Sequence, residues 1–104
     1  MERQNVTLHV VEWTGTKPNI VTAEGTRQGK VYRFNKRSGL AFNCRIMIFV
    51  DEAEQMCIGE SAVDATYLEM QKHLEEEKRL EERLVDVRRK ITELAVLGLA
   101  ESGV

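Results

Sequence analysis

The stretch Ser61–Leu97 reads SAVDATYLEMQKHLEEEKRLEERLVDVRRKITELAVL and contains neither glycine nor proline. Glu, Lys, Arg, Leu and Ala dominate it, and these residues favour the α-helix. Ser61 followed by Asp64 is typical of a helix start, because the hydroxyl accepts an unpaired backbone N–H and the acid lies near the positive end of the helix dipole. Gly98 is the expected stop. The sequence therefore predicts one helix over Ser61–Leu97.

This predicted helix is long for the chain that contains it. At a rise of 1.5 Å per residue it would extend roughly 55 Å, about twice the diameter of a globule made from the remaining residues. No glycine, proline, asparagine or serine occurs near Glu75–Glu77, where a helical hairpin is the alternative. The i,i+4 pairs Glu75–Arg79 and Asp86–Lys90 favour a continuous helix. We therefore expect part of the helix to pack on a surface outside its own chain.

Apolar residues of the helix form two stripes that are out of phase. The first, with spacings of four, three and four, is Val63, Tyr67, Met70 and Leu74. The second, with spacings of four, three, four and three, is Leu80, Leu84, Val87, Ile91 and Leu94. The six-residue step between them matches neither spacing, so the stripes face different directions. We expect the first to cover the chain's own β-rich part and the second to form a protein interface.

The N-terminal half has the alternation of β-strands. Val6–Trp13 is the first predicted strand, Ile20–Ala23 a short second strand, and Lys30–Phe34 the third. Residues 24–29 are predicted to be a loop because they are polar and contain two glycines. Leu40–Val50 alternates most strictly and is the longest predicted strand. Its expected core face is Leu40, Phe42, Cys44, Ile46, Ile48 and Val50.

A short helix is predicted over Asp51–Ile58, because acids crowd its first turn and Gly59 follows it. The expected fold is α+β: a small antiparallel sheet or barrel of about four strands, a short helix and one long C-terminal helix. The predicted division is a basic β-rich part, residues 1–59, and an acidic helical part, residues 60–104. The apolar tail Ala95–Ala100 is expected to dock on another surface.

The sequence contains no recognisable motif for several classes of function. No run of 18 or more apolar residues predicts a membrane span, and the N-terminus lacks the apolar segment of a secretory signal. His9 and His73 have no second ligand at metal spacing, and Cys44 and Cys57 form no C-x-x-C pattern, which favours two reduced thiols. No phosphate loop or catalytic arrangement is recognisable. We therefore expect no metal, no cofactor and no enzymatic activity.

Charge is distributed unevenly. Residues 1–50 contain eight Lys or Arg against three Asp or Glu, a balance of +5, and residues 51–104 contain seven against fourteen, a balance of −7. The segment Gly25–Val50 contains six basic residues and no acid. Such a chain can pair its basic part with the acidic part of another copy, or offer the basic part to a polyanion.

The candidate polyanion contacts are Arg27, Lys30, Lys36 and Arg37. They flank a predicted strand that includes Tyr32 and Phe34, and basic residues around exposed aromatics can bind single-stranded nucleic acid. The alternative is that both aromatics are core residues and the cations only solubilise turns. The alternation favours this alternative, because the aromatic face of the strand is the more apolar one.

Residues 20–58 contain one further pattern of glycine, aromatic and acidic residues. It consists of Gly29, Tyr32 and Phe34 in a G-x-x-Y-x-F strand, a later strand ending in Val50, and the helix start Asp51–Met56. In this pattern the segment resembles small virion proteins of tailed phages, of the kind encoded near the capsid gene. This resemblance implies a structural protein of the head, neck or tail, and no catalytic residues.

The sequence thus predicts a non-enzymatic structural or assembly protein that forms a homo-oligomer or part of a larger assembly. Its long helix would pack on other copies or on neighbouring virion subunits, in the virion or the host cytoplasm. The alternative hypothesis is a small nucleic-acid-binding regulator or anti-defence protein that uses the basic β-rich part.

Overall fold

The computed structural model describes residues 2–103 and confirms the predicted α+β class. Within these residues lie four strands, a 3₁₀ turn, a short helix and a long helix. In chain order they are β1 (Gln4–Thr14), β2 (Lys17–Gln28), β3 (Val31–Phe34), η1 (Leu40–Phe42), β4 (Met47–Phe49), α1 (Val50–Gln55) and α2 (Ala62–Glu101). The chain divides into two compact units, residues 1–71 and 72–104.

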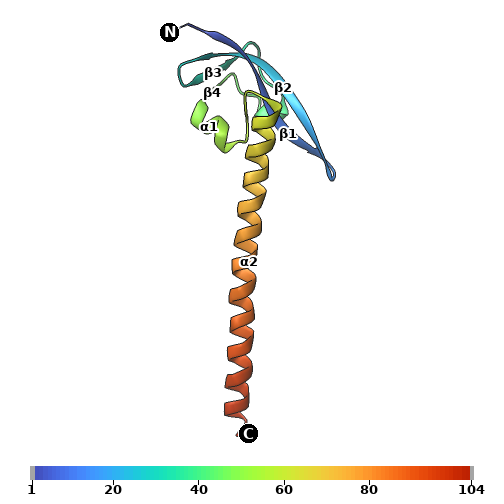
Figure 1. The fold of residues 1–104 in the computed structure, drawn as a ribbon, viewed down its shortest axis with the longest axis vertical. Helices are drawn as coiled ribbons and strands as arrows, with labels where there is room; N and C mark the ends of the chain where they lie inside the picture. The colour runs from blue at the N-terminus through green and yellow to red at the C-terminus, as the bar shows by residue number, and fades with distance from the viewer. Residues whose placement is uncertain (1, 104) are drawn as a thin grey trace. The chain divides into compact units, whose positions relative to one another are not determined.

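The four strands form one antiparallel sheet in the order β1–β2–β3–β4. Figure 1 shows the long β1–β2 hairpin and the much shorter β3 and β4 beside it. The hairpin register pairs Val10 with Val21 and Thr14 with Lys17. Leu8 and Val10 are buried, so the predicted alternation of the first strand is confirmed.

Strand β2 is longer than the sequence predicted. The expected loop over residues 24–29 is wrong, because the strand continues to Gln28. Gly25 pairs with Phe34 of β3, and a Cβ atom at Gly25 would lie 2.5 Å from the carbonyl oxygen of Arg33. This glycine therefore allows two strands to approach closely and does not form a turn.

We expect Gly25→Ala to destabilise the first unit by about 1–3 kcal/mol, because β3 must move to admit the methyl group. Gly39→Ala is the matched control, since a Cβ there meets nothing within 4 Å and its φ is −74°. Urea unfolding followed by far-UV circular dichroism measures both changes. Equal unfolding midpoints for the two variants would contradict this role for Gly25.

The predicted strand Leu40–Val50 is wrong over most of its length. The chain forms the 3₁₀ turn η1, and Asn43 and Cys44 then take left-handed φ values of 58° and 51°. Only Met47–Phe49 is a strand. Because the turn breaks the two-residue period, Leu40 and Ile46 are exposed instead of lying in the core.

The core of the first unit consists of side chains from the sheet, η1, α1 and the segment after α1. Its members are Leu8, Val10, Tyr32, Phe34, Phe42, Ile48, Ala53 and Ile58. Phe34 and Phe42 meet edge to face, with ring centroids 5.6 Å apart. Of the six residues expected on the core face of residues 40–50, only Phe42 and Ile48 are buried.

Helix α1 and the segment after it differ from prediction in where they end. The helix ends at Gln55, and Cys57 takes a φ of 60°. Gly59 instead pairs with His9 of β1 through two backbone hydrogen bonds of 2.7 and 2.9 Å. A Cβ at Gly59 would lie 2.8 Å from the backbone nitrogen of Ala65, so this glycine admits the first turn of α2.

Helix α2 begins as predicted and is continuous. The Ser61 hydroxyl accepts the backbone N–H of Asp64 at 3.1 Å. The expected stop at Gly98 is wrong: the helix runs through it to Glu101, and Gly103 takes the left-handed φ of 77°. One interior glycine costs a helix only about 1 kcal/mol, which the neighbouring helix formers offset.

Replacing Ser61 by alanine should lower the free energy of unfolding by about 1 kcal/mol, because the N–H of Asp64 loses its acceptor. Ser102→Ala is the control, since that hydroxyl donates to Leu99 in the last turn of α2 and caps no N–H. Chemical denaturation of both variants tests this expectation. A destabilisation by Ser102→Ala as large as that by Ser61→Ala would refute the capping role.

The first apolar stripe of α2 does not cover the sheet, contrary to prediction. Val63, Tyr67 and Leu74 are exposed, whereas Ala65 is fully buried and Leu68 half-buried. A Cβ atom at Gly59 would also lie 2.8 Å from the Cβ atom of Asp64, so the backbone of Gly59 packs directly against this turn. The buried side of the turn is thus Ala65, and the larger residues of the stripe are exposed.

Candidate functional site

The second unit contains a single regular element, the part of α2 from residue 72 to residue 101, among the residues described. All five residues of the second stripe are exposed there, by 58% at Leu80, 48% at Leu84, 43% at Val87, 61% at Ile91 and 65% at Leu94. Val96, Leu97 and Leu99 add further exposed apolar surface near the end of the helix. We call Leu80, Leu84, Val87, Ile91 and Leu94 the apolar stripe.

A helix of this kind needs packing to be stable. Most helices in proteins derive their stability from burying an apolar face, and a contiguous exposed apolar patch marks an interaction site. The spacing of four, three, four and three along the apolar stripe is that of helices that pack together side by side. The residues predicted as a protein interface are therefore all placed on an accessible surface.

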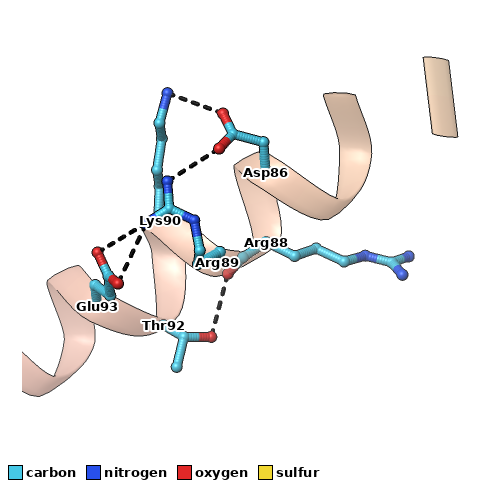
Figure 2. A network of polar contacts seen from close by, with 6 residues as sticks. All are labelled: Asp86, Arg88, Arg89, Lys90, Thr92 and Glu93. Carbon is cyan, nitrogen blue, oxygen red and sulfur yellow. Dashed lines mark hydrogen bonds and ion pairs between the residues drawn. The ribbon is translucent and has the colours of Figure 1, made fainter. Parts of the chain in front are cut away.

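Charged residues between the stripe positions form a network within the helix, which Figure 2 shows. Arg89 contacts Asp86 at 3.0 Å and Glu93 at 3.2 Å, and Lys90 contacts Asp86 at 3.1 Å. Hydrogen bonds from Arg89 and Lys90 lower the pKa of Asp86 below its ordinary value. Such exposed pairs contribute little energy individually but support the continuous helix.

The four candidate polyanion contacts are not gathered into one bare basic surface. Arg27 is in β2 and pairs with Glu60 at 2.6 Å, with its guanidinium over the Tyr32 ring. Lys30 lies in the β2–β3 turn, and Lys36 and Arg37 follow β3. Only these last three are exposed.

The hypothesis of a stacking surface at Tyr32 and Phe34 is wrong, because both rings are buried, with exposures of 4% and 8%. The alternative interpretation, in which the aromatics belong to the core, agrees with the structure. Arg27 is already neutralised by Glu60. The geometry therefore gives a bound base neither an aromatic face here nor the full charge of Arg27.

A polar cluster that sequence reasoning missed joins β2, β3 and the segment before α2. The Tyr32 hydroxyl donates to Glu60 at 2.7 Å, and Arg27 bonds the same carboxylate oxygen. They line a surface pocket of about 370 Å³ together with Glu54, Asp64 and other residues. Burial and the hydrogen bond to Glu60 raise the pKa of Tyr32 to about 12. Glu60 is separated by 28 residues from Tyr32, so no local pattern signals this contact.

The raised pKa of Tyr32 predicts a loss of stability at high pH. The folded state holds the phenol proton more tightly than the unfolded state, whose pKa is the ordinary 10.0. The resulting stability is fully present below pH 10 and is lost as the pH rises through about 12. Tyr32→Phe should therefore show a shallower fall of unfolding free energy over this range, measured by urea unfolding. The same pH dependence in wild type and variant would contradict this assignment.

Among residues 2–103, no three or more His, Cys, Asp or Glu side chains are grouped so that they could hold a metal ion. Cys57 is buried and Cys44 half-buried, and both are thiols. No helix in the described part of the chain has the length and apolar character needed to cross a membrane.

Comparisons with protein-family models, with curated proteins and with solved structures find no match to this chain.

Proposed function

We propose that this chain is a non-enzymatic structural or assembly protein that associates through the apolar stripe of α2. The observation that supports this proposal most strongly is the exposure of all five stripe residues on a helix that is the only element of its unit among the residues described. Burying one Leu or Ile side chain is worth about 1.5–3 kcal/mol, so several such residues supply a large driving force for association.

The first unit adds exposed apolar residues of its own. Ile46, Phe49 and Val63 are exposed by more than half, and Tyr67 and Met70 line a second surface pocket with Val63. A larger assembly uses surfaces for more than one neighbour, and these exposed residues are candidates for a second contact. They are too exposed to be accounted for by the core of the unit.

A place in a tailed-phage virion is the setting that we propose for this assembly. The support for it is the G-x-x-Y-x-F pattern at Gly29, Tyr32 and Phe34, followed by the acidic helix start at Asp51. In such a particle the chain would act as a repeated subunit, with its helix packed against helices of neighbouring copies.

Amide hydrogen exchange at two protein concentrations tests the proposed association. Exchange over residues 80–94 should slow between about 0.1 and 100 µM, because association protects a helix that otherwise frays. Amides paired between β1 and β2 serve as the internal control and should not change. Equal exchange at both concentrations, with the chain monomeric at each, would contradict the proposal.

A further inference from the structure

Two adjacent segments of α2 carry opposite net charge. Residues 75–82 contain five Glu against two basic residues, a net charge of −3. Residues 83–90 contain four basic residues against one Asp, a net charge of +3. Two copies packed parallel and in register would place each segment against its own like charge, whereas antiparallel copies place the acidic segment against the basic one.

Individual residue pairs beside the apolar stripe also favour antiparallel packing. In a parallel pair, the flanking positions bring Glu76 against Glu81 and Arg83 against Arg88 of the second copy, which are like charges. In the antiparallel register that places Leu84 against Val87 of the second copy, Glu81 lies beside Arg88. This pair is of opposite sign and occurs twice by symmetry.

Glu81 and Arg88 are both available to pair with a second copy. Neither Glu81 nor Arg88 makes an ion pair with any other residue from 2 to 103, and the Arg88 guanidinium extends away from the network in Figure 2. The antiparallel register also brings Arg83 near Lys90 of the second copy, a like pair. Asp86 already pairs with Lys90 at 3.1 Å and so offsets that repulsion.

We infer that the partner of the apolar stripe is a second copy of this chain, packed antiparallel along residues 80–91 with Glu81 beside Arg88 of the other copy. This inference rests on the proposed function, because it specifies the partner and the orientation for that same surface. It also gives the interface a twofold axis, so that each copy contributes the same residues.

Charge reversal in the full-length chain tests the orientation. Glu81→Arg and Arg88→Glu should each weaken self-association by roughly tenfold at low salt, because each places two like pairs at the interface. The double variant E81R/R88E should return to wild-type affinity. Sedimentation velocity over a concentration series measures all of them. Glu82→Arg is the matched control, since it makes the same charge change on the opposite side of the helix.

A parallel arrangement of the two copies predicts the opposite effect of the single variants on self-association. There, Glu81→Arg would face Glu76 and Arg88→Glu would face Arg83, so each single variant would associate more tightly than wild type. Stronger association of the single variants, or no change in any variant, would overturn the inference and leave the proposed association standing. A wild-type chain that stays monomeric throughout the series would instead overturn the proposed function and the inference with it.

Discussion

The double substitution Leu84→Glu, Ile91→Glu should abolish self-association of the chain at micromolar concentration. Each lost aliphatic contact removes roughly 2 kcal/mol, so a pair of copies should bind at least about a thousandfold more weakly. The glutamates would also require a charge to be buried without a partner. Light scattering measures the loss, and circular dichroism of the β-sheet signal reports whether the first unit stays folded.

Val85→Glu, Thr92→Glu is the matched control for that experiment. These residues directly follow the two stripe residues and point to another side of the helix. Val85 is 67% exposed, so its exposure alone does not distinguish it from Leu84. If the control variant lost association as completely as the stripe variant, the two added negative charges would explain the effect wherever they lie on the helix. The stripe would then not be the interface.

Replacing Phe42 by alanine should destabilise the first unit by about 3–5 kcal/mol, a large share of the stability of a small unit. Phe42 is 1% exposed and packs edge to face on Phe34. Phe49→Ala is the control: that ring is 54% exposed, so its loss should cost less than about 1 kcal/mol. Urea unfolding compares the two variants. Similar costs for both would contradict the placement of η1.

A second pair of variants checks the same segment with aliphatic residues. Ile48 is 1% exposed and Ile46 is 69% exposed, although a continuous strand would put both on one face. Alanine at Ile48 should therefore destabilise the first unit, and alanine at Ile46 should have little effect. Equal losses of stability at the two positions would contradict the turn and would favour the continuous strand that the sequence alone predicts.

Local sequence patterns correctly predicted the elements that are determined by residues close together in the chain. The period of two in Val6–Trp13 found β1, because one face of that strand is buried throughout the middle of the element. The hydroxyl of Ser61 and the acid at Asp64 located the start of α2, because a helix cap is set by residues within one turn. The run without glycine or proline after Ser61 predicted a continuous helix, and that prediction is confirmed.

Failures of prediction occurred where tertiary contacts decide the backbone. Gly25 and Gly59 look like turn residues in the sequence, but both allow backbone segments to approach each other. The alternation of Leu40–Val50 is broken by left-handed residues at Asn43 and Cys44, which no apolar pattern indicates. The contact of Glu60 with Tyr32 joins distant segments and has no local signal.

The apolar stripe was identified from its spacing alone, because an interface helix and a buried helix share the same period. The sequence does not reveal whether the stripe residues are exposed or buried. Only the structure shows that Leu80, Leu84 and Ile91 have no buried surroundings among the residues described. The orientation of a partner helix depends on charges spread over several turns, which become informative once the helix is known to be continuous.

The molar mass of the pure full-length chain in solution tests the central claim most directly. Light scattering coupled to size separation at about 100 µM should give a whole-number multiple, at least twofold, of the 11.9 kDa chain mass, because the proposed association buries the apolar stripe between copies. A mass of 11.9 kDa at that concentration would show that the helix remains alone in solution and would contradict the account.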